Sequence, residues 1–97
     1  MIGVIATLKI KEGKGAEFEA AANQLVKKVN ANEGGVVYYD LYKQDDTTYV
    51  FLERYKDQAA LDIHRQTDYY KAAGAQLGAF VTTAPDIKIL AAVLDKK

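Results

Sequence analysis

The chain has 97 residues, of which 49% are hydrophobic and 27% charged, a composition typical of one globular domain spanning residues 1–97. Thirteen basic residues balance 13 acidic ones, so nothing favours a nucleic acid or an anionic membrane as partner. The absence of cysteine excludes disulfides, thiolate metal sites and a cysteine nucleophile. We expect a cytoplasmic protein, because the start of the chain does not resemble a signal peptide and no apolar run approaches the ~20 residues of a membrane span.

The first half of the chain shows a strand pattern followed by a helix pattern. Apolar residues alternate over residues 2–11, which predicts a strand of period two. From Ala16 the period becomes that of an amphipathic helix, and Gly34 and Gly35 end it. The apolar stripe of this helix consists of Phe18, Ala21, Ala22, Leu25, Val26 and Val29.

The second half predicts two strands, a broken helical region and a last strand. Residues 36–43 and 48–55 are rich in Val and Tyr and flank a polar hairpin loop. Asp57 is a suitable N-cap for a helix from Gln58 to about Arg65. Thr67 or Asp68 can cap a further helix towards Phe80, and residues 86–94 form the last strand.

The resulting order is β-α-β-β-α-β, the α+β ferredoxin-like arrangement of a four-stranded antiparallel sheet with helices on one face. Both faces of the sheet are apolar in this sequence. The second strand has Val37, Tyr39 and Leu41 on one side and Val36, Tyr38 and Tyr42 on the other. An uncovered face of this kind is unusual for a monomer, so we expect a homodimer in which two sheets pack ~10 Å apart.

Candidate catalytic groups are few. The usual nucleophile, phosphate-loop and metal motifs are absent, and the scattered carboxylates predict no protein-bound metal. His64 is the one histidine and shares a helix side with Ala60 and Leu61. It is either a partly buried helix-edge residue bonded to the backbone, which the residue pattern alone favours, or a base aimed into a pocket between helix and sheet.

Seven tyrosines form a second feature, and most of them fall on the two middle strands. Core and interface packing explains most of them, because tyrosine buries area and keeps one polar group. The alternative is an aromatic pocket for a flat ligand such as a quinol. An RNA-recognition module is disfavoured, because the third strand lacks the basic opening of such modules and the net charge is zero.

Four segments together resemble the antibiotic biosynthesis monooxygenase family, which includes quinol monooxygenases. Residues 6–14 are similar to its first strand and turn, and residues 32–39 to its "EPGCxxY" step into the second strand. Residues 51–64 are similar to its "ERWxxxxAxxxH" stretch, and residues 67–70 stand where the family often has "SxHF". The resemblance covers nearly the whole chain, and its order and spacing make it specific.

The resemblance implies a dimeric α+β barrel and oxidation of quinols or polyphenols by O₂ without metal, flavin or haem. In that chemistry a base removes a phenolic proton, and the electron-rich anion then reduces oxygen. His64 is the implied base, and we assign substrate contacts to Tyr49, Phe51, Tyr69 and Tyr70. Tyr69 replaces a second histidine of the family, which speaks against a two-histidine mechanism.

Other family activities are either disfavoured or left open. The positions needed for haem degradation hold Ala6, His64 and Gly74, and the chain has no Trp, so haem degradation is not expected. Two alternatives to the monooxygenase remain. One is a non-enzymatic, stress-associated dimer that binds an aromatic ligand, and the other is an isomerase of a small metabolite, which should need a basic cluster at the pocket.

Overall fold

The computed structural model of the chain describes residues 1–94. The elements are β1 (Ile2–Lys9), α1 (Gly15–Asn32), β2 (Val36–Asp45), β3 (Thr48–Tyr55), α2 (Gln58–Gln66), α3 (Asp68–Gly78) and β4 (Asp86–Ala91). They form one sheet of order β2-β3-β1-β4 in which every neighbouring pair is antiparallel. The predicted ferredoxin-like order is therefore confirmed, including the division of the second helical region into α2 and α3.

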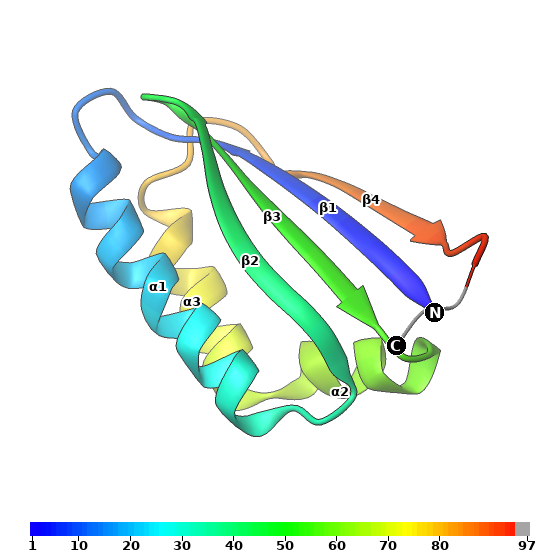
Figure 1. Ribbon diagram of the computed structural model, residues 1–97. Helices are drawn as coiled ribbons and strands as arrows, with labels where there is room; N and C mark the ends of the chain where they lie inside the picture. Colours follow the sequence, from blue (N-terminus) through cyan, green and yellow to red (C-terminus); the bar gives the residue numbers. More distant parts are fainter. Residues whose placement is uncertain (95–97) are drawn as a thin grey trace.

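The helices lie on one face of the sheet, and α2 lies at the end where β2 begins and β3 ends (Figure 1). The core fills the space between the helices and this inner face. The predicted apolar stripe of α1 is buried apart from Val26, which is half-buried, and Phe18 and Val29 are fully inaccessible. Alternate residues of β1 and β3 are buried on this inner face, as the period of two requires. They are Val4, Ala6 and Leu8 in β1, and Tyr49, Phe51, Glu53 and Tyr55 in β3.

The structure corrects the predicted faces and bounds of the outer strands. Val36 packs against the core, although strict alternation assigns it to the opposite side with Tyr38. The register of β2 against β3 shifts between these two residues, and such a bulge turns one extra side chain towards the same face. The strand β2 also continues to Asp45, and β4 ends at Ala91 rather than at residue 94.

The start of β2 approaches α2 closely. A Cβ atom placed on Gly35 would lie 2.6 Å from the Cβ of Ala60, so only glycine fits there without a displacement. The Lys56 amide donates a hydrogen bond of 2.9 Å to the Gly35 carbonyl. The predicted cap of α2 is confirmed, since Asp57 Oδ1 accepts from the Ala60 amide at 2.8 Å. These contacts fix the end of α1 beside α2.

The outer face of the sheet has no covering element among residues 1–94. Its centre is apolar, formed by the half-buried side chains of Ile5, Val50 and Leu52. Around it lie Tyr38, Tyr42 and Leu90, whose side chains are 41%, 54% and 50% exposed. Asp40 in β2 pairs with Leu52, and Lys88 in β4 pairs with Ile5, so one negative and one positive charge flank the apolar centre. No helix in the described part of the chain is long and apolar enough to cross a membrane.

We propose that this outer face is covered by a second copy of the chain. Sedimentation at micromolar concentration should then give about twice the chain mass of 10.7 kDa. Replacing Leu52 by Lys should yield a monomer, because a charge at the centre of the interface would lose its water without a partner. The matched control is Ile63→Lys on α2, where the wild-type side chain is already 62% exposed, and it should remain dimeric. A monomeric wild-type chain would refute this proposal.

Candidate active site

A cavity of about 320 Å³ lies between α3 and the inner face of the sheet. Its volume is in the range of small-molecule sites in proteins. The wall is largely apolar and is built from every strand and helix of the fold. The apolar members include Val4, Ala6, Leu8, Leu25, Phe51, Leu61, Leu77, Val81 and Ile87. The polar and charged members are Tyr39, Glu53, His64, Arg65, Tyr70 and Lys71.

His64 is the most completely buried of these polar groups. It occupies the last turn of α2 and is 1% exposed, more deeply buried than the sequence indicates. Its Nδ1 lies 3.1 Å from each carboxylate oxygen of Glu33 rather than against the backbone. Its Nε2 is buried and has no hydrogen-bond partner among residues 1–94. A carboxylate only accepts hydrogen bonds, so Nδ1 carries the proton and Nε2 has a free lone pair.

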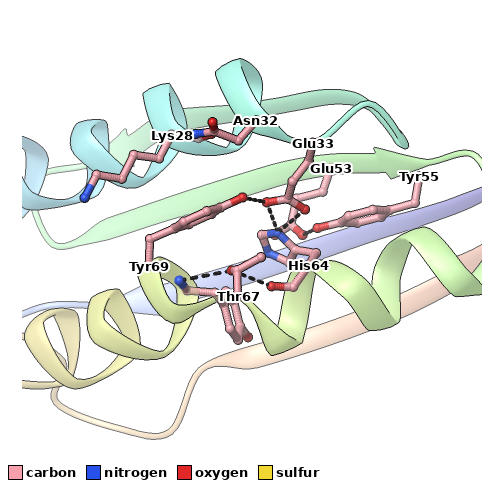
Figure 2. Close-up of polar contacts among 9 residues, drawn as sticks. Lys28, Asn32, Glu33, Glu53, Tyr55, His64, Thr67 and Tyr69 are labelled. Atoms are coloured by element: carbon pink, nitrogen blue, oxygen red, sulfur yellow. Dashed lines mark hydrogen bonds and ion pairs between the residues drawn. The ribbon is translucent and has the colours of Figure 1, made fainter.

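Glu33 is the site residue that sequence reasoning missed. It is the C-cap of α1, and the approach of Gly35 to Ala60 holds it beside α2. Its carboxylate also accepts a hydrogen bond from the Tyr69 hydroxyl, so residues from α1, α2 and α3 converge on one group (Figure 2). The only sequence signal is the helix stop at residues 32–35, within the segment that resembles the family step into the second strand.

Three tyrosine rings enclose the imidazole. The ring centroids of Tyr39, Tyr55 and Tyr70 lie 5.1, 5.4 and 4.7 Å from that of His64. This burial lowers the pKa of His64 below its ordinary value of 6.5, and the opposing effect of Glu33 is smaller. The imidazole is therefore neutral at neutral pH, the state in which Nε2 can accept a proton.

Glu53 is a second titratable group in the cavity wall. It is 7% exposed, and the Tyr55 hydroxyl donates a hydrogen bond of 2.5 Å to it (Figure 2). Burial raises the pKa of Glu53 to about 7, although Tyr55 and Arg65 both act in the opposite direction. Its protonation therefore changes near neutral pH. In the described residues 1–94, no group of three or more His, Cys, Asp or Glu side chains is arranged to hold a metal ion.

The predicted substrate contacts divide among three locations. Phe51 and Tyr70 line the cavity together with His64. Tyr69 instead supports Glu33, and Tyr49 lies under the start of α1, where its ring is 4.8 Å from that of Phe18 and its hydroxyl binds Glu19. The assignment of substrate contact to these four residues stays a prediction, and the geometry favours Phe51 and Tyr70 for that role.

Comparisons with known proteins agree with this architecture. The family model of the antibiotic biosynthesis monooxygenases matches residues 1–76. A Bacillus subtilis protein named "Putative monooxygenase YcnE" is 36% identical over 87 residues, which cover 88% of this chain and 90% of that one. A Mycobacterium tuberculosis protein named "Putative monooxygenase Rv0793" is 31% identical, over 93% of this chain and 89% of that one.

A solved structure is similar at the level of fold and sequence. It is a "putative antibiotic biosynthesis monooxygenase" from Caulobacter crescentus, with a TM-score of 0.90 and 46% sequence identity over 96% of this chain and 90% of that chain. Together with the family match, these relatives show that the chain belongs to the antibiotic biosynthesis monooxygenase family. The resemblance found in the sequence is thereby confirmed.

The raised pKa of Glu53 makes stability depend on pH. The folded chain holds this proton up to about pH 7, whereas an unfolded chain releases it near 4.5, so the wild type loses stability as pH rises between these values. Glu53→Gln keeps a hydrogen-bond acceptor for Tyr55 and removes the charge. We expect this variant to be more stable than wild type above pH 7, by about 1–3 kcal/mol in the free energy of unfolding.

Urea unfolding of both proteins at several pH values measures this difference. It should shrink as pH falls and vanish below the ordinary carboxyl pKa, because wild-type Glu53 is then protonated in both states. A difference that is constant with pH would show that the carboxyl group of Glu53 is not perturbed.

Proposed function

We propose that this chain is a cofactor-independent monooxygenase that oxidises a quinol or polyphenol with O₂, with His64 as the base. The proposal depends mainly on His64, which lines a largely apolar cavity and whose buried Nε2 atom has no hydrogen-bond partner among residues 1–94. A buried polar atom of this kind is costly unless a ligand completes its hydrogen bonding. A phenolic hydroxyl supplies the missing donor.

The first step of the proposed reaction is proton transfer. The substrate hydroxyl donates to Nε2 and passes its proton to the imidazole, which becomes a cation between the quinolate and Glu33. The carboxylate of Glu33 stabilises this cation, as the acid of a serine-protease triad does for its histidine. The apolar wall excludes water, so the negative charge of the quinolate is poorly solvated and its electrons are easier to remove.

The second step consumes oxygen, and its balance needs no other reductant. The quinolate transfers one electron to O₂, and the semiquinone and superoxide combine to form a C–O bond. The proton held by His64 returns to this peroxide, which then loses water as the O–O bond and one ring C–H bond break. Quinol and O₂ thus give a hydroxyquinone and water. The substrate supplies all four electrons, one oxygen atom enters the ring, and the other leaves as water.

The two alternative functions differ from the monooxygenase in whether oxygen is consumed. A non-enzymatic binding protein would fill the same cavity with an aromatic ligand, and an isomerase would convert its substrate without oxygen. An oxygen electrode and a panel of quinols therefore separate the proposed monooxygenase from both. Stoichiometric uptake of O₂ with formation of hydroxyquinone supports the proposal, and the absence of uptake with every quinol opposes it.

His64 and Glu33 should affect the rate in distinguishable ways. His64→Gln should slow turnover per folded molecule by ~10²-fold or more, the usual contribution of a positioned base. The protonation of His64 should lower wild-type activity at low pH with a pKa below 6.5, because the protonated imidazole cannot act as a base. Glu33→Gln should move this acid limb to lower pH, because the Glu33 carboxylate raises the pKa of His64.

The folded fraction must be measured alongside the rate, since His64 is 1% exposed and its replacement also affects the core. Near-ultraviolet circular dichroism supplies that fraction. Ile63→Gln, next to His64 on the exposed side of α2, is the matched control and should turn over like wild type. If His64→Gln oxidises quinols at the wild-type rate per folded molecule, His64 is not the base.

A further inference from the structure

The cavity has an asymmetric distribution of charge. Its interior end carries His64 and Glu53, which are both buried. Its other charged lining residues are Arg65, in the last turn of α2, and Lys71, in α3, and both are exposed. All four residues line this cavity. The exposed Arg65 and Lys71 mark the side that faces solvent, here called the mouth, and the buried His64 and Glu53 mark its interior. The mouth of the cavity is therefore positively charged.

The two cations differ in how far the protein neutralises them. Neither side chain makes a hydrogen bond or an ion pair within 4 Å among residues 1–94. Arg65 lowers the pKa of Glu53 by favouring its carboxylate, so part of the charge of Arg65 is matched inside the cavity. Among residues 1–94, Glu53 is the only acidic residue that lines the cavity, so no second carboxylate of the described lining matches the charge of Lys71.

The geometry near Lys71 connects the mouth to the base. Lys71 follows Tyr70, whose ring is 4.7 Å from that of His64 and lines the same cavity. One turn of α3 therefore presents an aromatic surface to the interior and a cation to the mouth. A ligand with its ring beside Tyr70 and a hydroxyl at His64 would direct its opposite end towards Lys71.

We infer that the cavity selects an aromatic hydroxyl compound that carries an anionic substituent, whose charge binds Lys71 and Arg65 at the mouth while a ring hydroxyl meets Nε2 of His64. A carboxylate is the chemical class that suits this arrangement, since both lysine and arginine bind it through charged hydrogen bonds. The inference deepens the proposed function by naming the substrate class, but the binding it describes does not require oxidation.

Binding without oxygen tests this selectivity separately from turnover. The probes are 2,5-dihydroxybenzoate and its methyl ester, which share a ring and hydroxyl groups and differ in charge. Anaerobic calorimetry at neutral pH should show that wild type binds the acid about 5-fold more tightly than the ester, a ratio that falls as salt is added. Lys71→Gln should lose most of this preference, and the double variant Arg65→Gln/Lys71→Gln should lose all of it.

The matched control is Lys27→Gln, since Lys27 is an exposed lysine of α1 that does not line the cavity. It should keep the wild-type preference for the acid. Equal binding of acid and ester by wild type, or a preference that survives in the double variant, overturns the inference, as does the absence of acid binding at millimolar concentration.

Oxygen uptake then separates this inference from the proposed function. Preferential binding of the acid without any O₂ uptake by a quinol panel leaves the inference standing and removes the monooxygenase. Rapid oxidation of neutral quinols, together with equal binding of acid and ester, would support the monooxygenase and refute the anionic substrate class.

Discussion

The hydrogen bond between Glu33 and Nδ1 of His64 is the interaction on which the site depends. It joins the C-cap of α1 to the last turn of α2, two positions 31 residues apart in the chain. By holding the proton on Nδ1, it leaves a free lone pair on Nε2, which is buried and has no hydrogen-bond partner among residues 1–94. Without this bond the imidazole would have no fixed tautomer, and the cavity would be an apolar space without a directed base.

Burial and charge oppose each other at this bond, and the fold sets their balance. The tyrosine rings and the sheet remove water from the imidazole, which disfavours its cation. Glu33 favours the imidazolium cation. The Tyr69 hydroxyl donates to the same carboxylate and thereby weakens this effect of Glu33. The histidine is therefore neutral before substrate arrives and has a carboxylate partner once it accepts a proton. Glu53 is buried and makes no ion pair among residues 1–94, so burial raises its pKa and it holds its proton to about pH 7.

Local spacing in the sequence predicts the elements and most of the core. Alternation in β1 and the helical period of α1 depend on neighbouring residues only, so the sequence predicts the first strand and assigns Phe18 and Val29 correctly to the buried side of the helix. The caps Asp57 and Thr67 are likewise short-range features. Val36 is assigned wrongly, because a bulge shifts the register in a way that strict alternation cannot express. These elements are enough to define the ferredoxin-like fold.

The candidate site depends on contacts that spacing does not encode. In the sequence, Glu33 is part of the segment that ends the first helix. Its hydrogen bond to His64 depends on the fold, which places the end of α1 beside α2. Tyr49 and Phe51 share one face of β3, but the position of α3 decides which of them lines the cavity, and it selects Phe51. Similarly, Lys71 is an ordinary surface lysine in the sequence, and the cavity wall gives it a location beside Tyr70.

Nitrogen NMR of the imidazole measures directly whether Nε2 of His64 is an unprotonated base. His64 is the only histidine in the chain, so its two ring nitrogens can be assigned without ambiguity. We predict a proton on Nδ1 and none on Nε2 at neutral pH, and a titration midpoint below 6.5. A proton on Nε2, or an imidazolium ion at neutral pH, would contradict this prediction.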